Sequence, residues 1–182
     1  MNPINRFVQQ SHLDAKTVPM SFVTVPWGKL YKTDFLASNS IQFPAGKYED
    51  VPWCYQCNLC ANRVVAISTP IVWYRIHDAS TLQRRADHHF DAFEQWEITL
   101  SIFHNTPEMP PHIFAFIQAN CFVHLTHILF ASRVPKDGEI EFARRIRGIF
   151  PSDKTLKALF KDHRQHKLGM RRIRKLRRVL AA

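Results

Sequence analysis

The pattern of apolar and polar positions divides the chain into a helical second half and a more irregular first half. Residues 87–103 carry Phe90, Phe93 and Ile98 among polar neighbours, which is typical of an amphipathic helix. Residues 113–132 are strongly apolar and long enough for a buried helix. The remaining elements predicted in this half are a turn at 135–138, a helix over 139–150 and a last helix, capped by Ser152, that continues into the basic tail.

The first half alternates short apolar runs with turn residues. Residues 22–25, 41–43 and 63–74 are β-branched or alternating segments, which favour strands. A short helix or turn is expected from Trp27 to Phe35. Glu49 and Asp50 are natural helix-start residues, so a helix is predicted from there to about Ala61. The pattern therefore predicts a helix-rich α+β fold with a few short strands.

Composition places the chain among ordinary globular proteins. Of its 182 residues, 46% are hydrophobic and 22% charged, which is enough for one domain with a buried core. No apolar run is expected to reach the ~20 residues of a membrane-spanning helix, and the N-terminus lacks the apolar core of a signal peptide. Four cysteines in such a chain indicate reduced thiols in a cytoplasm.

The formal net charge of +10 is concentrated at the C-terminus, because residues 163–182 hold eight Lys or Arg and no acid. Ile173, Leu176 and Leu180 share one helical face, as in an interfacial helix on anionic lipid. The predicted membrane-binding cations are Arg171, Arg172, Arg174, Lys175, Arg177 and Arg178. A solvated terminus is the second interpretation. Nucleic acid ranks third and is not an expected partner.

Cysteine and histidine clusters raise the question of a metal. Cys54, Cys57 and Cys60 read C-x-x-C-x-x-C, but the position of a fourth ferredoxin-type ligand is Val64. Three thiols at this spacing lie along one side of a helix, where core packing is the favoured role. The remaining pairs of histidines have two-ligand spacing without an evident third ligand: His88 with His89, and His124 with His127.

Between Trp27 and Ser80 the order of motifs resembles the C-terminal half of family-2 glycosyltransferases, the inverting GT-A-type enzymes of bacterial surface polysaccharides. That family commonly reads W-x-K-L-Y, then F-L, then I-x-F-x-x-G-x-x-x-E-D, then Y-x-Y-R-x-x-x-x-S. The matching residues here are Trp27 to Tyr31, Phe35-Leu36, Ile41 to Phe43, Gly46, Glu49-Asp50 and Trp73-Tyr74-Arg75 to Ser80. The family's N-terminal nucleotide-binding half, with its D-x-D motif, has no counterpart in the sequence.

The resemblance implies a role for Asp50 as the base that takes the acceptor's proton, with Glu49 beside it as an orienting group. The alternative is that the pair only caps a helix, and the flanking motifs favour the catalytic role. In either case the helix N-terminus is expected to keep the Asp50 carboxylate ionised.

The same resemblance implies further substrate-binding residues. Trp27, Lys29 and Tyr31 are candidates for stacking on a sugar or meeting a diphosphate, although a helix anchor with a solvated lysine is an equal alternative. The implied roles in the later loop are binding of the diphosphate leaving group by Arg75 and Ser80, and coordination of the divalent metal (Mn²⁺ or Mg²⁺) by His77.

As a whole, the chain is expected to contain an acceptor-side part of a GT-A-type domain at 1–85, a helical region at 86–162 and a basic tail at 163–182. The implied function is transfer of a sugar from a nucleotide-sugar to a glycan or lipid-linked acceptor of lipopolysaccharide, capsule or a similar polymer. Activity is expected to require a separate donor-binding half. The expected location is the cytoplasm, at the inner face of the plasma membrane. The alternative is a non-catalytic binding module with a membrane- or phosphate-binding tail.

Overall fold

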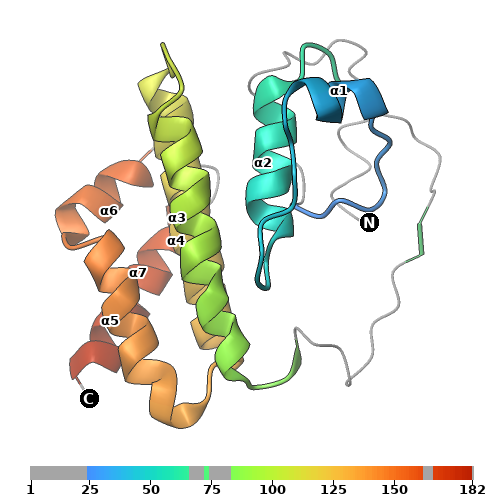
Figure 1. Ribbon diagram of the computed structural model, residues 1–182. Helices are drawn as coiled ribbons and strands as arrows, with labels where there is room; N and C mark the ends of the chain where they lie inside the picture. The colour runs from blue at the N-terminus through green and yellow to red at the C-terminus, as the bar shows by residue number, and fades with distance from the viewer. Residues whose placement is uncertain (1–23, 66–71, 74–82, 162–165, 182) are drawn as a thin grey trace. The chain divides into compact units, whose positions relative to one another are not determined.

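Most of the chain is helical. A computed structural model describes residues 24–65, 72–73, 83–161 and 166–181. Helices account for 67% of these residues, and none of them belongs to a strand (Figure 1). By its internal contacts the chain divides into two compact units. Unit 1 comprises Met1–Ala45 and Glu49–Ile76, and unit 2 comprises Gly46–Tyr48 and His77–Ala182.

The predicted α+β fold with a partial GT-A-type domain is wrong, because such a domain needs a sheet and the described residues contain none. A short β-branched run becomes a strand only beside a partner that shares its backbone hydrogen bonds. At 41–43 the Ile41 N–H donates instead to the carbonyl of Leu36, at 3.0 Å. The predicted strands at 22–25 and 63–74 lie partly outside the described residues, and their described residues are not in strands.

Unit 1 contains two helices, α1 (Thr33–Ser38) and α2 (Asp50–Cys60). The helix or turn expected from Trp27 therefore becomes helical only at Thr33. Gly28 precedes it with a φ of +74°, a turn conformation that glycine adopts at no steric cost. The core residues of this unit are Ile41, Trp53, Cys54 and Cys57, with Tyr31, Phe35, Leu36 and Cys60 packed against them.

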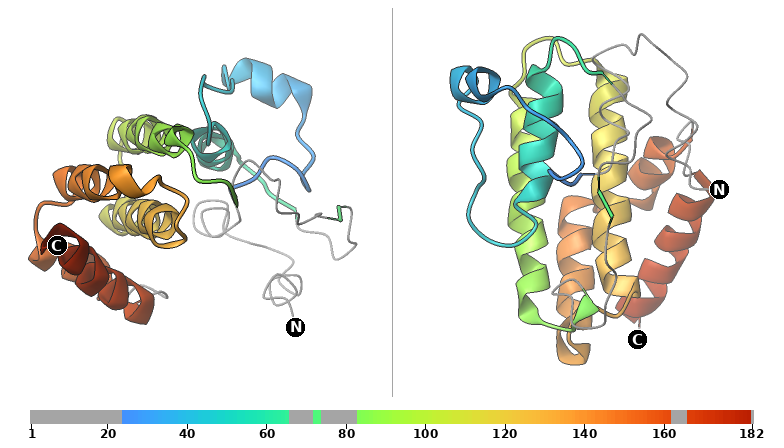
Figure 2. Two further views of the ribbon diagram at one scale, coloured as in Figure 1. Left: turned by 90° about the horizontal axis from the view of Figure 1, so that it is seen from below. Right: turned by 90° about the vertical axis from the view of Figure 1, so that its right-hand side faces the viewer.

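Unit 2 is a helical bundle. Its helices are η4 (Asp87–Phe90), α3 (Asp91–His104), α4 (Pro111–Phe130), η5 (Lys136–Gly138), α5 (Glu139–Ile149), α6 (Asp153–Leu159) and α7 (His166–Ala181). Viewed end-on, α3 and α7 lie on opposite sides of α4 (Figure 2, left). Up to Phe150 the predicted helices of this half are confirmed to within a few residues, because proline and glycine breaks separate long periodic segments.

Helix α4 is the centre of unit 2 and contacts α3, α5, α6 and α7. The expectation that no apolar run approaches 20 residues was wrong, since α4 is long and apolar enough to cross a membrane by length and composition. In the bundle, however, Ile117, Phe122 and Leu125 are fully buried. Helices that are apolar all round are characteristic of protein cores as well as of membranes.

The basic tail belongs to the same bundle. Ser152 caps α6 as predicted, because its hydroxyl accepts hydrogen bonds from the N–H groups of Lys154 and Thr155. The prediction of one last helix was wrong: α6 ends at Leu159, and the tail forms the separate helix α7. A Cβ atom on Gly169 would lie 2.5 Å from the ring of Phe160, so glycine allows α7 to pack closely on this aromatic side chain.

Candidate functional site

The predicted carboxylate pair lies at the N-terminus of α2 in unit 1. Glu49 is the residue before the helix and Asp50 is in its first turn, and both are partly exposed. The Glu49 side chain makes no capping hydrogen bond, whereas backbone N–H groups of Asp50 and Val51 interact with the Asp50 carboxylate. Asp50 thus stabilises the first turn of α2 and still keeps part of its surface open to a ligand.

The environment of Asp50 has opposing effects on its pKa. Burial, followed by the neighbouring charge of Glu49, raises the Asp50 pKa to about 6. The backbone N–H groups and the Lys29 ammonium act in the opposite direction, and they are outweighed. The helix N-terminus therefore acts in the predicted direction, although desolvation is the larger effect and raises the net pKa. With a pKa of about 6 the carboxylate is still mostly ionised at neutral pH.

Lys29 is brought close to Asp50, as required if both belong to one site. Its ammonium donates a hydrogen bond to the carbonyl of Val25. The Lys29 pKa is lowered overall, because the effect of burial is larger than the opposing effects of Cys54, Cys57 and Asp50. The Lys29 ammonium and the Asp50 carboxyl, whose pKa is raised, therefore lie in the same partly desolvated region of unit 1.

The other two residues of the predicted substrate group have different positions. Trp27 is 46% exposed, so part of its surface is open to solvent. Tyr31 contacts Trp53 edge-to-face, with ring centroids 4.7 Å apart, and it packs against the core of unit 1. Trp27 thus keeps the geometry of a binding residue, whereas Tyr31 anchors the segment that carries Lys29.

Sequence reasoning missed an aromatic pair in unit 1. Phe43 is stacked on Trp53 with centroids 4.5 Å apart and an angle of 6° between the rings, and Phe43 is 50% exposed. A signal was present, because Ile41 and Phe43 are two residues apart in an extended segment and so point to the same side. Phe43 therefore adds a second accessible aromatic side chain to unit 1.

The cysteines of α2 are core residues, as predicted. Cys54 and Cys57 are buried and Cys60 is partly buried, all as free thiols. Burial raises the Cys54 pKa to about 11 and the Cys57 pKa to about 12, which leaves both thiols protonated at neutral pH. These side chains supply packing and a low-dielectric wall beside Lys29.

Three predicted site residues, Arg75, His77 and Ser80, lie outside the described residues. Within the part of the chain that the structure describes, no group of three or more His, Cys, Asp or Glu side chains is arranged to hold a metal ion. The described residues do not by themselves fit a divalent metal site.

The tail cations of α7 fall into two classes. The Arg172 guanidinium is partly buried and donates to the Val123 carbonyl at 2.6 Å and to the Thr126 hydroxyl at 2.9 Å. Arg177 is paired with Asp153. The cations whose side chains are exposed and line a shallow surface hollow are Arg171, Arg174, Lys175 and Arg178.

Polar side chains are also buried inside unit 2. The Tyr48 hydroxyl and His89 Nδ1 are 2.6 Å apart, and His89 Nε2 lies 2.8 Å from the Arg84 carbonyl. A carbonyl only accepts, so His89 Nε2 donates and its Nδ1 accepts from Tyr48. The Trp96 indole N–H donates to His124 Nδ1 at 2.9 Å. These bonds satisfy buried polar atoms and fix the positions of α3 and α4.

Comparisons of the chain with protein-family models, with curated proteins and with solved structures find no match.

Proposed function

We propose that unit 1 provides the acceptor side of an inverting glycosyl transfer from a nucleotide-sugar to a surface glycan, with Asp50 as the general base. The observation that carries this proposal is the environment of Asp50. A general base works best when its pKa lies near the working pH, and burial together with Glu49 raises the Asp50 pKa to about 6. At neutral pH such a group is mostly ionised and accepts a proton readily.

In the proposed step the acceptor hydroxyl oxygen bonds to the anomeric carbon of the donor sugar. The bond from that carbon to the nucleotide diphosphate breaks on the opposite face, and the hydroxyl proton passes to the Asp50 carboxylate. Glu49 orients the acceptor, and the Lys29 charge favours the ionised form of Asp50 before transfer. Trp27 and Phe43 offer exposed aromatic surface to the apolar face of a sugar ring.

The donor side lies elsewhere in this proposal. The nucleotide-sugar and its divalent metal, Mn²⁺ or Mg²⁺, are assigned to a nucleotide-binding half supplied by another segment or another chain. A bound metal would neutralise the diphosphate as it leaves. The proposed contribution of Glu49, Asp50 and Lys29 is confined to binding and deprotonating the acceptor.

The proposal is testable on the isolated chain. We expect saturation-transfer NMR to detect oligosaccharides of bacterial surface glycans on the chain, and Trp27→Ala to weaken that binding about tenfold, roughly the 1.4 kcal/mol that a well-placed aromatic contact provides. Trp73→Ala is the matched control, because Trp73 is 94% exposed and is not one of the proposed acceptor-binding residues. Calorimetry should show weak or no binding of nucleotide-sugar with Mn²⁺.

Two results would count against the acceptor site. One is equal glycan binding by the wild-type chain and Trp27→Ala, and the other is an equal loss in Trp73→Ala. Micromolar binding of a nucleotide-sugar by the isolated chain would overturn the assignment of the donor to another segment.

A second function is favoured by the exposed cations of α7. In that alternative the chain is a non-catalytic module that retains an acceptor pocket and holds it at an anionic surface. Only the catalytic function requires the carboxyl of Asp50 for turnover. Contact between α7 and an anionic surface is compatible with both functions.

A further inference from the structure

The inner side of helix α7 packs against the other helices of the bundle. Gly169, Ile173 and Leu176 are buried, and α7 contacts α4, α5 and α6. Burying side chains such as Ile173 and Leu176 is strongly favourable, so these residues are held in the core. The apolar stripe that suggested an interfacial helix is therefore occupied, and insertion of this stripe into lipid would require α7 to leave the bundle.

Two of the tail cations are also used inside unit 2. Arg172 bonds to the Val123 carbonyl and the Thr126 hydroxyl of α4. Arg177 pairs with Asp153, which also accepts from Arg147 at 2.8 Å. These contacts fix α7 in place, and they engage the guanidinium groups of Arg172 and Arg177 within unit 2.

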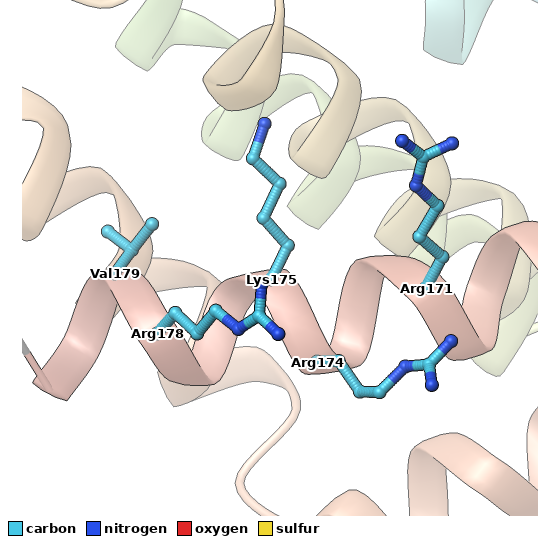
Figure 3. Close-up of a pocket in the computed structure, with 5 residues that line it drawn as sticks. All are labelled: Arg171, Arg174, Lys175, Arg178 and Val179. Atoms are coloured by element: carbon cyan, nitrogen blue, oxygen red, sulfur yellow. The ribbon is translucent and has the colours of Figure 1, made fainter.

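The other four predicted cations are Arg171, Arg174, Lys175 and Arg178, which form the outer side of α7 and are here called the α7 cationic face. All four are exposed, and with Val179 they line a shallow hollow. Arg171 and Lys175 extend to one side of the helix axis and Arg174 and Arg178 to the other (Figure 3). Positions 171 to 178 span about 10 Å along the axis at 1.5 Å per residue. No Asp or Glu occurs in α7.

We propose that the α7 cationic face docks the protein on an anionic lipid bilayer. Charge complementarity is the main argument, since each cation close to an anionic leaflet adds attraction without needing a shaped pocket. Val179, which is partly exposed, and Leu168, which is 37% exposed, add apolar contact at the same helix. The mode of binding is electrostatic adsorption of a folded bundle, and it is strongly weakened by salt.

The composition of α7 favours lipid over nucleic acid. Proteins that hold single strands without sequence preference stack bases on aromatic side chains, and α7 contains no Phe, Tyr or Trp between His166 and Ala181. It also lacks the Asn, Gln, Ser and Thr side chains that commonly bond to base edges and sugars.

The test is sedimentation of the full chain with vesicles of phosphatidylcholine containing about one third phosphatidylglycerol, at low salt. The triple variant Arg171→Ala, Arg174→Ala and Arg178→Ala should bind about 100-fold more weakly than the wild type. Lys175 is left unchanged because its ammonium lies 4.3 Å from the centre of the Phe130 ring. Neither protein should sediment with pure phosphatidylcholine, and 1 M salt should release the wild type.

The matched control removes the same charge from other helices of unit 2. Lys136, Arg144 and Lys154 are exposed, and their combined change to alanine should leave vesicle binding within about twofold of wild type at equal ionic strength. An equal loss in both triple variants would overturn the proposal, because net charge alone would then explain binding. It would also be overturned if the wild type failed to bind, or if duplex DNA of equal phosphate concentration displaced it from vesicles.

Discussion

At the scale of single residues, buried polar groups give the protein measurable responses to pH. His124 is a clear case, because its Nδ1 accepts a hydrogen bond from the Trp96 indole. Burial, followed by the charges of His127, Arg133 and Arg172, lowers the His124 pKa to about 3. A proton on Nδ1 would also face the indole N–H donor, so protonation breaks this bond.

The resulting prediction concerns stability in acid. In the unfolded chain His124 binds a proton below its ordinary pKa of 6.5, whereas in the folded chain it stays neutral down to about pH 3. Its contribution is therefore fully present above pH 6.5 and is lost as pH falls through this window. We expect the free energy of unfolding, measured by urea denaturation, to fall by a few kcal/mol, about 1.4 kcal/mol for each pKa unit.

His124→Gln removes the titrating group and keeps a neutral side chain that can accept from Trp96. Its unfolding free energy should depend less on pH between 6.5 and 3 than that of the wild type. His112→Gln, which changes an exposed histidine at the start of α4, is the matched control and should keep the wild-type dependence. Identical pH profiles for the wild type and His124→Gln would show that His124 does not control acid stability.

At the scale of elements, the close approach of α7 to the end of α6 depends on one glycine. In Gly169→Ala the new methyl group would lie 2.5 to 2.7 Å from ring atoms of Phe160, which is far inside van der Waals contact. Overpacking of this kind costs about 1–3 kcal/mol. We therefore expect a lower melting temperature for Gly169→Ala, together with reduced proteolytic resistance of the tail.

The control for this prediction is a second helical glycine. Gly148 lies near the end of α5 and is exposed, and a methyl group at this position would meet no other part of the protein within 4 Å. Gly148→Ala should be neutral or stabilising by up to about 1 kcal/mol, because alanine is the better helix former. Equal melting temperatures for the two variants would contradict the close packing between α7 and Phe160.

The helices illustrate what a single sequence predicts well. From Asp87 to Phe150, apolar periodicity and the breaks near Pro111 and Gly138 place the helices correctly, because both signals are local in the chain. The break between α6 and α7 was not predicted. The strand at 41–43 was wrong because strand formation depends on a partner strand, and the Ile41 N–H bonds to the Leu36 carbonyl of α1 instead.

The candidate site shows the same limit. That Glu49 and Asp50 start a helix is local information, and it was predicted. The approach of Lys29 to Asp50 joins positions 21 residues apart, and the stacking of Phe43 on Trp53 depends on how the loop returns to α2. Burial decides the direction of the Asp50 pKa, and burial is a property of the folded chain.

At the scale of the whole molecule, the chain combines two kinds of unit. Unit 1 presents a carboxyl with raised pKa and exposed aromatic side chains. Unit 2 is a helical bundle whose C-terminal helix carries the α7 cationic face. The proposed roles are independent, since loss of vesicle binding would leave the acceptor site unchanged and loss of the acceptor site would leave vesicle binding unchanged.

The central claim is that Asp50 is the base for glycosyl transfer. Its most direct test is turnover of Asp50→Asn at saturating donor and acceptor, with the chain joined to or mixed with a nucleotide-sugar-binding half, and with thermal stability measured alongside. Asparagine keeps the size of the side chain and its ability to accept hydrogen bonds from backbone N–H groups, so folding should change little. It does not accept the acceptor's proton at neutral pH, and the rate should fall by about 10²- to 10⁴-fold.

Glu49→Gln should lose less activity, because orientation of the acceptor does not require a proton acceptor. The wild-type rate should also decline below pH of about 6, where Asp50 becomes protonated. Turnover of Asp50→Asn close to that of the wild type, with an unchanged melting temperature, would contradict the claim and leave Asp50 as a helix-start residue. A 10²-fold or larger loss in a variant that melts at the wild-type temperature is the result that the proposed mechanism predicts.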